Sequence, residues 1–403
     1  MLVGFTVLLF IAALVPLNPI RDAVDGSIVS DARLERSLAY AALGPISSVF
    51  DAMTLFTVGQ IIGLTLWVVA LYALARYLFY RRRRAISLVR EGSYAVLALV
   101  ALLIAYAAVV FLPRPMARLI VTRSDVIAVD FHSHTRYSHD GRPGWSPADV
   151  RDWHANAGYN AVYITDHATF DGAAEGVLLD TTLAGNGTLL CPGLEAFYHG
   201  EHVNILSAGV RYNGLTSADL REVDDQALAI ASHIPAFEPV LVETIPGDLS
   251  KILPAHGPGT AGVRAIEIVD GSPRGMSQIR RDHARIIHLA DSLNLALVAG
   301  TDNHGWGRTA AGWTLLRLPG WRGYAADGMA REIEMTVRGA GRTGTHVIER
   351  TTASATPIAV ATTLPTVVWT VMRTLSSGER VAWFIWFWAV WLIVLVVRSR
   401  SAP

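Results

Sequence analysis

Five apolar runs set the first constraint on how this chain of 403 residues folds. The runs cover residues 2–17, 54–80, 93–113, 356–372 and 381–397. A helix needs about 20 apolar residues to cross the hydrocarbon of a bilayer, with roughly 17 as the lower limit. We therefore expect about three transmembrane helices in an N-terminal membrane region, residues 1–119, and about two in a C-terminal one, residues 351–403. The first run has no basic start and no small-residue cleavage site, so we interpret it as an uncleaved anchor.

The chain between the third and fourth runs has a different character. Overall, 52% of the residues are hydrophobic and only 17% are charged, but residues 120–350 mix polar and apolar side chains. All 13 histidines lie in this segment, between His132 and His346. We expect one soluble domain there, long enough for a single core. The formal net charge is zero and Cys191 is the only cysteine, so neither a nucleic-acid surface nor an intrachain disulfide is expected.

Strand and helix patterns alternate along this segment. Apolar strands are predicted at residues 126–131, 160–165, 188–193, 202–209, 264–269 and 295–300. Helices are predicted at 146–158, where Ser146 is the N-cap and Pro147 the first helical residue, and at 275–294. Apolar strands that alternate with helices indicate an α/β fold with a parallel sheet, and we expect the sheet to close as a barrel.

Metal-binding side chains follow the ends of these strands. The stretch DFHSHTRYSHDG (130–141) follows the first strand, Asp166 and His167 the second, Glu195 the third, and Asp302 and His304 the last. The carboxyl ends of barrel strands lie on one face, so these groups are expected to meet in space. Imidazole and carboxylate donors favour Zn, Mn or Fe over a thiolate site.

The motifs DFHSHTRYSHDG, YITDH, GLE and GTDNH, in this order, resemble those of the PHP (polymerase and histidinol phosphatase) family. The resemblance covers about residues 126–345 and does not include the membrane segments. It implies a distorted, TIM-like (β/α)7 PHP barrel, here flanked by transmembrane α-helices. It also implies a metal-dependent phosphoesterase that holds two or three divalent metal ions of Mn, Zn or Fe.

The resemblance further implies which residues bind the ions. The first metal is expected at His132, His134 and Asp302, the second at His202 and His233, and the third at His167 and His304. Glu195 is the expected bridging carboxylate, and Asp140 is the expected remaining ligand of the first motif. Two positions stay open: His139 is an alternative to Asp140, and His256 is an alternative to His233.

Other residues are expected to act on the substrate. The expected catalytic residues are Asp302, Glu195 and His304. Arg136 and Arg308 flank the motifs and are candidates for binding phosphate through paired hydrogen bonds. Three histidines in helical patterns are expected to be ordinary surface or packing residues: His154, His283 and His288.

The expected protein is thus a membrane-anchored phosphoesterase that hydrolyses a phosphate ester with a metal-activated water. Its partner is a phosphorylated substrate, of the envelope or lipid-linked, and nucleic acid is not expected. Two alternatives are an amidohydrolase-like enzyme and a metal-stabilised binding or sensory domain without turnover.

Arginines in short loops favour the cytoplasmic side of a membrane. The loop between the second and third runs carries Arg81, Arg82, Arg83, Arg84 and Arg90, and the loop between the last two runs carries Arg373 and Arg380. We therefore expect an integral protein of the cytoplasmic membrane with both loops in the cytoplasm. The metal-binding domain and, after five spans, the C-terminus would lie outside.

Overall fold

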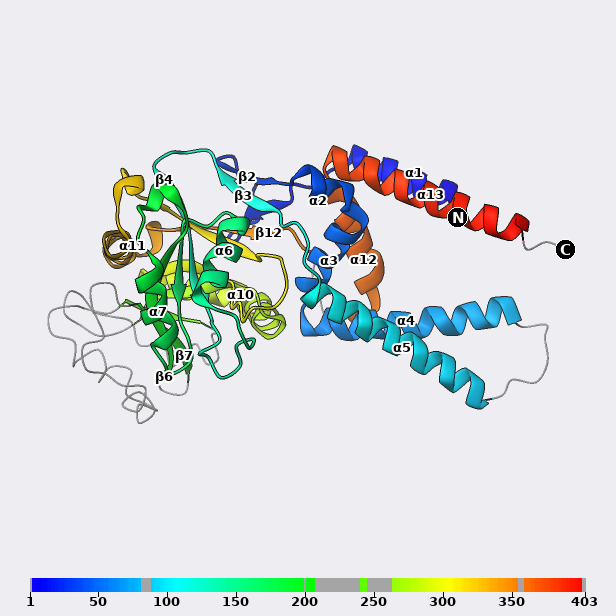
Figure 1. Ribbon diagram of the computed structural model, residues 1–403, viewed down its shortest axis with the longest axis horizontal. Helices are drawn as coiled ribbons and strands as arrows, with labels where there is room; N and C mark the ends of the chain where they lie inside the picture. The colour runs from blue at the N-terminus through cyan, green and yellow to red at the C-terminus, as the bar shows by residue number, and fades with distance from the viewer. Residues whose placement is uncertain are drawn as a thin grey trace.

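The computed structural model describes residues 2–80, 88–198, 201–206, 240–244, 263–353 and 359–400. It has a mixed α/β domain, from one side of which a group of long helices extends (Figure 1). The strands are β1 (Ile20–Asp22), β2 (Ala32–Glu35), β3 (Arg118–Val121), β4 (Val126–Ser133), β5 (Ala161–Ile164), β6 (Leu189–Tyr198), β7 (Glu201–Leu206), β8 (Val240–Glu243), β9 (Val263–Asp270), β10 (Ala296–Gly300), β11 (Gly312–Arg317) and β12 (His346–Arg350). The α-helices are α1 (Leu2–Leu14), α2 (Leu38–Ala42), α3 (Gly44–Thr54), α4 (Val58–Tyr80), α5 (Leu88–Phe111), α6 (Pro147–Ala157), α7 (Asp171–Leu179), α10 (Pro273–Leu293), α11 (Ala326–Ala340), α12 (Ala359–Thr374) and α13 (Ser377–Arg400).

Ten of these strands form one curled sheet in the order β1-β12-β11-β4-β5-β6-β7-β8-β9-β10. β4, β5 and β6 are parallel, as are β8, β9 and β10, whereas β7 and β11 run antiparallel to their neighbours. The sheet curls until its last strand approaches β4. Ser133 bridges Asn303, and a Cβ on Gly300 would lie 2.7 Å from the Cβ of His132. The carboxyl ends of β4 and β10 therefore meet.

Apolar side chains cover both faces of this sheet, which explains why β4 reads as a continuous apolar run and is buried along its whole length. On one face Phe131 and Tyr163 share a core with Ile333 of α11. On the other, Ala128 shares a core with Trp153 of α6. Because both faces are covered, most of the polar side chains that meet in the domain lie at the ends of the strands.

The local predictions around α6 are confirmed. Ser146 is the N-cap: its side chain accepts from the backbone N–H of Asp149, and the Asp149 carboxylate accepts from the backbone N–H of Ser146. Pro147 is the first helical residue, and the chain leaves the helix at Gly158 with φ +95°. A side chain would strain this left-handed position.

The expected regular alternation of parallel strands and helices does not hold across the described strands. β6 and β7 form an antiparallel hairpin, and β11 and β12 add two antiparallel pairings beside β4. A parallel connection needs a crossover of about a dozen residues. Only residues 199–200 separate β6 from β7, so these strands can pair only in antiparallel fashion.

Two short segments that precede the long helices complete this domain. β1 pairs antiparallel with β12, with Ile20 opposite Arg350, and Arg21 Nε donates to Glu349 Oε1 at 2.7 Å. β2 pairs with β3 in a separate two-stranded sheet. Ile20 is fully buried. The domain expected at residues 120–350 therefore also takes up chain from 20–35.

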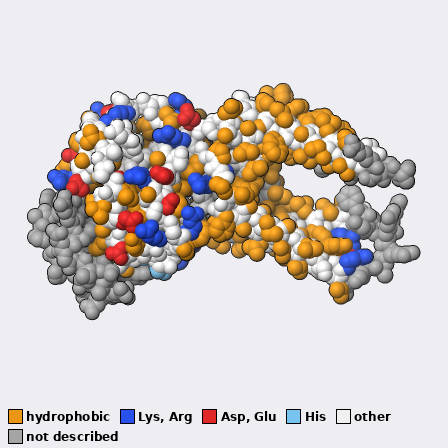
Figure 2. Space-filling view, in the orientation of Figure 1, with side chains coloured by type: hydrophobic (Ala, Val, Ile, Leu, Met, Phe, Trp, Pro, Cys, Tyr) orange, Lys and Arg blue, Asp and Glu red, His pale blue; other side chains and the backbone are white. Residues whose placement is uncertain are grey.

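Three of the five apolar runs form helices that could cross a membrane. The segments Val58–Leu78, Val89–Phe111 and Ser377–Val397, in α4, α5 and α13, are long and apolar enough to do so. At most 11% of the residues in each segment are buried inside the protein. Figure 2 shows hydrophobic side chains covering this region, in contrast to the mixed surface of the α/β domain.

The other two runs form shorter helices. α1 has 13 residues, so at 1.5 Å per residue it extends about 20 Å, less than the roughly 30 Å of hydrocarbon. The described part of α12 has 16 residues and begins where the described chain resumes at Ala359. α1 lies beside α13, where the rings of Phe5 and Phe387 stack 3.7 Å apart. α12 packs against α4, where a Cβ on Gly63 would lie 3.0 Å from the Cβ of Thr363. The described helices thus offer three candidate spans in place of the five expected.

The connection from α12 to α13 lies next to the N-terminal segment. The backbone N–H of Leu17 donates to the carbonyl of Arg373 at 3.0 Å, and Arg36 pairs with Glu379 at 3.0 Å. The five-span prediction places Arg373 and Arg380 on the opposite side of a membrane from Arg36, whereas these contacts hold the α12–α13 connection beside the segment that contains Arg36.

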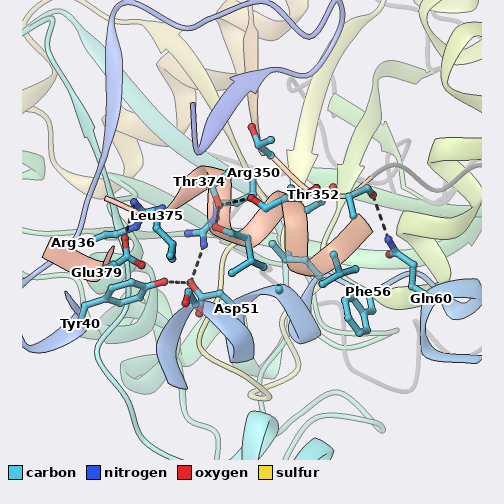
Figure 3. A pocket seen from close by; sticks show the side chains of 18 residues that line it. Arg36, Tyr40, Asp51, Phe56, Gln60, Arg350, Thr352, Thr374, Leu375 and Glu379 are labelled. Carbon is cyan, nitrogen blue, oxygen red and sulfur yellow. Dashed lines mark hydrogen bonds and ion pairs between the residues drawn. The ribbon is translucent and has the colours of Figure 1, made fainter. Parts of the chain in front are cut away.

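Asp51 of α3 joins the helices to the α/β domain. One carboxylate oxygen, Oδ2, accepts from Arg350 and from Tyr40, each at 2.8 Å. The other, Oδ1, accepts from Thr309 at 2.8 Å and from Arg114 at 3.3 Å. Figure 3 shows Tyr40, Asp51 and Arg350 pointing toward one another in a pocket between the helices and the domain. Thr309 lies on the loop between β10 and β11, so this carboxylate binds both regions.

Candidate metal centre

The ends of β4 and β10 bring two pairs of donor side chains together. The backbone N–H of Asp302 donates to the carbonyl of His132 at 2.9 Å, and that of His134 to the carbonyl of Asn303 at 3.0 Å. Asp302 has φ +47°, a conformation that costs a residue with a side chain about 1–3 kcal/mol. The backbone bonds to β4 hold Asp302 in this position, which turns its carboxylate toward the histidines.

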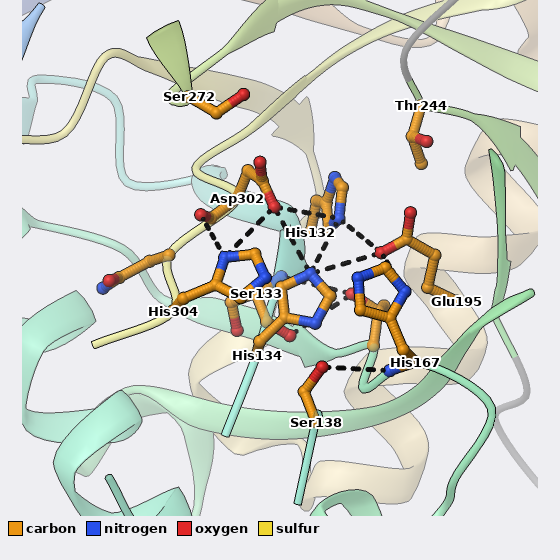
Figure 4. Close-up of polar contacts among 12 residues, drawn as sticks. His132, Ser133, His134, Ser138, His167, Glu195, Thr244, Ser272, Asp302 and His304 are labelled. Carbon is orange, nitrogen blue, oxygen red and sulfur yellow. Dashed lines mark hydrogen bonds and ion pairs between the residues drawn. The ribbon is translucent and has the colours of Figure 1, made fainter. Parts of the chain in front are cut away.

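Four side chains converge on one point (Figure 4). His132 Nε2 lies 3.0 Å from His134 Nε2, 3.0 Å from Glu195 Oε2 and 3.5 Å from Asp302 Oδ1. His134 Nε2 lies 3.3 Å from the same glutamate oxygen and 3.4 Å from the same aspartate oxygen. Two donors bound tetrahedrally to one ion at about 2.1 Å lie about 3.4 Å apart. The spacing of these four atoms therefore fits a divalent metal ion.

A second donor group lies nearer the solvent and contains Asp140, His167 and His304, with His134 beside them. Asp140 Oδ2 is 3.1 Å from His304 Nε2 and 3.5 Å from His167 Nε2. His304 Nδ1 lies 2.9 Å from the carbonyl of Asp302, so the proton belongs on Nδ1 and the lone pair of Nε2 faces the group. Of the two alternatives in the first motif, Asp140 is the one within this group of donor atoms, and the ring of His139 lies beside it, 5.0 Å between centroids from the ring of His167.

Glu195 connects the first group to a third one. It lies on the β6–β7 hairpin, where its Oε1 is 2.6 Å from Nδ1 of His202. Its Oε2 is 3.0 Å from Nε2 of His132 and 3.3 Å from Nδ1 of His167. The two oxygens of Glu195 thus face different histidines. A carboxylate that bridges two cations has the same arrangement. His233 and its alternative His256 lie outside the described residues.

Glu267 of β9 is a buried residue of the site that the sequence motifs do not contain. Its Oε1 lies 3.0 Å from Nδ1 of His132, and burial raises the pKa of Glu267 to about 7. A proton between Glu267 Oε1 and His132 Nδ1 leaves Nε2 of His132 with a free lone pair on the side of Glu195. Carboxylates orient metal-binding histidines in this way. The signal in the sequence is a single glutamate within the apolar strand RAIEIV.

His154, expected to be a surface or packing residue, is a buried residue that also pairs with a carboxylate. His154 is fully buried, with Nε2 2.6 Å from Asp130 Oδ2 and Nδ1 2.7 Å from the carbonyl of Val150. Asp130 also accepts from the backbone N–H of Thr301 at 2.9 Å and from its hydroxyl. Thr301 precedes Asp302, so this buried pair supports the loop that carries two of the donors.

The two predicted phosphate-binding arginines have different surroundings. Arg136 pairs with Glu175 at 2.7 Å and lies over the ring of Tyr137, so a carboxylate already balances its charge. Arg308 has no ion pair within the described part of the chain. Burial and the nearby charges of Arg114 and Arg142 lower the pKa of Arg308.

The protonation of the donors is consistent with a cation site. Burial by itself lowers the pKa of His134, but hydrogen bonds to Asp302 and Glu195 outweigh it and raise the pKa to about 9. Asp302 and Glu195 thus stabilise a positive charge between them, and a bound metal ion would supply such a charge. Burial lowers the pKa of His167 to about 4, so its ring is neutral at pH 7 and offers a lone pair. Nδ1 of His134 and Nε2 of His304 are buried without a hydrogen bond in the described residues.

No family model and no curated protein matches this sequence. Among solved structures, the chain is similar to PsfC from Pseudomonas syringae, with 18% identity over 62% of this chain and 98% of that one, and a TM-score of 0.36. It is similar to a provisionally assigned metal-dependent phosphoesterase from Bifidobacterium adolescentis, with 16% identity, coverage of 52% and 96%, and a TM-score of 0.30. It is also similar to the lesion-specific endonuclease Q from Pyrococcus furiosus, with 14% identity, coverage of 55% and 57%, and a TM-score of 0.35. These values are too low to assign an activity.

Proposed function

We propose that this protein is a membrane-anchored, metal-dependent phosphoesterase that hydrolyses a phosphate ester. The observation that carries the proposal is the convergence of imidazole and carboxylate donors around Glu195, with the atoms of each donor group within 4.8 Å of one another. This set suits two or three divalent ions of Mn, Zn or Fe. Held at these donors, such ions supply a water of lowered pKa and positive charge beside the phosphoryl oxygens.

The residues would divide the work by position. Glu195 lies between the first and third donor groups and would hold them at a fixed separation. Burial alone would raise the pKa of Asp302, but His132 and the hydrogen bond from His134 lower it to about 2. The Asp302 carboxylate is therefore ionised and can orient an attacking water by accepting its proton in a hydrogen bond. His304 lies with Asp140 at the solvent side, where the leaving group of a substrate would depart.

The full-length protein in detergent is expected to hydrolyse an aryl phosphate when Mn, Zn or Fe is supplied. A chelator should abolish the activity, and one of the metals should restore it. The measurement is a panel of phosphomonoesters, phosphodiesters, amides and lactones with each metal in turn. Cleavage of amides alone would favour the amidohydrolase-like alternative. Stoichiometric metal without any turnover would favour a binding or sensory domain.

We propose that α4, α5 and α13 cross the cytoplasmic membrane and leave the α/β domain outside the cell's cytoplasm. The sequence RRRR at 81–84 joins α4 to α5 at the ends distant from the domain, and α13 ends with Arg398 and Arg400. This arginine distribution favours the cytoplasm for the distant ends. With three spans, the C-terminus also lies in the cytoplasm. With five spans it would lie on the same side as the α/β domain.

A reporter that is active only outside the cytoplasm is expected to work when fused after residue 350. A fluorescent reporter that folds only in the cytoplasm is expected to work after residues 87 and 400. The reverse pattern at all three positions would show that the domain faces the cytoplasm.

A further inference from the structure

The loop that follows the metal-binding residues is attached to the end of a candidate membrane helix. The backbone N–H of Gly307 donates to the carbonyl of Val110, near the C-terminus of α5, at 3.2 Å. Gly307 is the third residue after His304, so the Cα atoms of the two lie at most about 10 Å apart. The solvent side of the metal centre is therefore within about 15 Å of the end of α5. The polar head-group layer of a bilayer is itself roughly 5–8 Å thick on each side.

Exposed aromatic side chains mark the same place. Phe111, the last residue of α5, is 63% exposed and packs edge-to-face with Trp306, which is 39% exposed, at 5.4 Å between ring centroids. Trp306 is two residues beyond His304. Aromatic side chains that contact apolar groups on one side and water on the other are typical of the interface between bilayer and water. The loop between β10 and β11 thus lies where lipid head groups would be.

Two arginines, Arg142 and Arg308, lie on the loops that carry Asp140 and His304. The backbone N–H of Arg142 donates to the carbonyl of His304 at 2.9 Å, and its guanidinium lies 4.7 Å from the ring centroid of Trp145 and 5.9 Å from that of Trp306. Arg308 follows in the same loop as His304, and burial together with the positive charges of Arg114 and Arg142 lowers its pKa. Within the described part of the chain neither arginine forms an ion pair. A phosphate dianion bound at the edge of the metal centre would neutralise these two positive charges.

The backbone around Arg142 is built to keep this arrangement. Gly305 has φ +88°, and a Cβ there would lie 2.7 Å from the ring of Trp145 and 3.0 Å from the Cβ of Arg142. A side chain at Gly305 would separate the two loops. The close approach brings the arginine of one loop beside the aromatic ring of the other.

On these observations, and resting on the phosphoesterase function proposed above, we propose that the substrate is an amphiphile. Its acyl or alkyl part stays in the bilayer beside α5, and Arg142 and Arg308 receive its phosphate at the rim of the metal centre. Arg142 and Arg308 could bind the phosphate ester of a lipid head group or that of a water-soluble molecule. The experiment must distinguish these two kinds of substrate.

The test uses the full-length protein in phosphatidylcholine vesicles, loaded with its most activating metal. Two probes carry the same leaving group: 4-methylumbelliferyl phosphate, which is soluble, and its hexadecanoylamide derivative, which enters the bilayer. The derivative is expected to react with a kcat/KM roughly ten-fold or more above that of the soluble probe. Added phosphatidylcholine should slow the derivative at constant bulk concentration, because it dilutes the probe within the bilayer.

Arg142→Gln and Arg308→Gln are each expected to raise KM for the derivative roughly ten-fold or more, with a much smaller change in kcat, because a charge-assisted hydrogen bond to phosphate is lost. The matched control is Arg317→Gln, whose guanidinium pairs with Asp125 and is mostly exposed. If both probes react equally and dilution has no effect, the membrane source is excluded. If the arginine variants match the control, the phosphate-binding role is excluded. Failure to hydrolyse either probe would instead refute the phosphoesterase function.

Discussion

The Glu195→Gln variant is expected to lose at least about 100-fold in kcat/KM and most of its bound metal. Glu195 is almost fully buried and faces four histidines, of which His202 is nearest at 2.6 Å. Glutamine keeps the shape of the side chain but removes its charge, so the first and third donor groups would no longer share an anionic ligand. The measurements are steady-state kinetics on a phosphoester and the metal content of the purified protein.

Glu332→Gln provides the matched control, because this glutamate lies on α11 outside the donor groups. The control should keep both its metal and its rate. If Glu195→Gln also keeps its full metal content and rate, Glu195 is not a ligand, and the first group would have to depend on Asp302 alone for its negative charge.

The His154→Ala variant is expected to unfold with a free energy about 3–5 kcal/mol lower than the native protein, because Asp130 would keep a buried charge without its partner. For a domain of this size the loss corresponds to roughly 6–20 °C in the midpoint of thermal unfolding. Metal affinity should fall as well, since Asp130 also holds Thr301 beside Asp302. Thermal unfolding and metal titration of the full-length protein in detergent measure the two effects.

His288→Ala is the control for this experiment, because His288 is an exposed residue of α10. His283 is less suitable, since its Nε2 lies 2.7 Å from the carbonyl of Ala23. Adding Asp130→Asn to His154→Ala should recover part of the lost stability by removing the unpaired charge. Equal midpoints for His154→Ala and His288→Ala would contradict the buried pair.

The parts of the site that the sequence predicts are those set by local structure. His132, His134, Asp302 and His304 follow apolar strands that the sequence marks clearly, and their convergence follows from strands sharing one direction. Glu267 lies in mid-strand, where its partner depends on the curl of the sheet. Residues of this kind become visible only when the whole sheet is in place.

The same limit applies to Asp130 and His154, and to the membrane region. His154 lies in an amphipathic helix, and only the packing of α6 against β4 shows that Asp130 faces it. The apolar run at 356–372 has the composition of a membrane span, and only the structure shows that its described part, from Ala359 on, packs against α4. Composition shows how apolar a segment is, but it does not show how long the helix is or which helices pack against it.

The pairing of β1 with β12 also orders the events of synthesis. Ile20–Asp22 leaves the ribosome early, but its partner strand, joined to it through Arg21 and Glu349, follows 328 residues later in the chain. The α4–α5 hairpin is made in between. β1 therefore stays unpaired until β12 has been synthesised, and contacts so distant in the chain form slowly. With α4 and α5 inserted as proposed above, assembly of this sheet edge would be coupled to membrane insertion, because β1 and β12 can pair only when both lie on the same side of the bilayer.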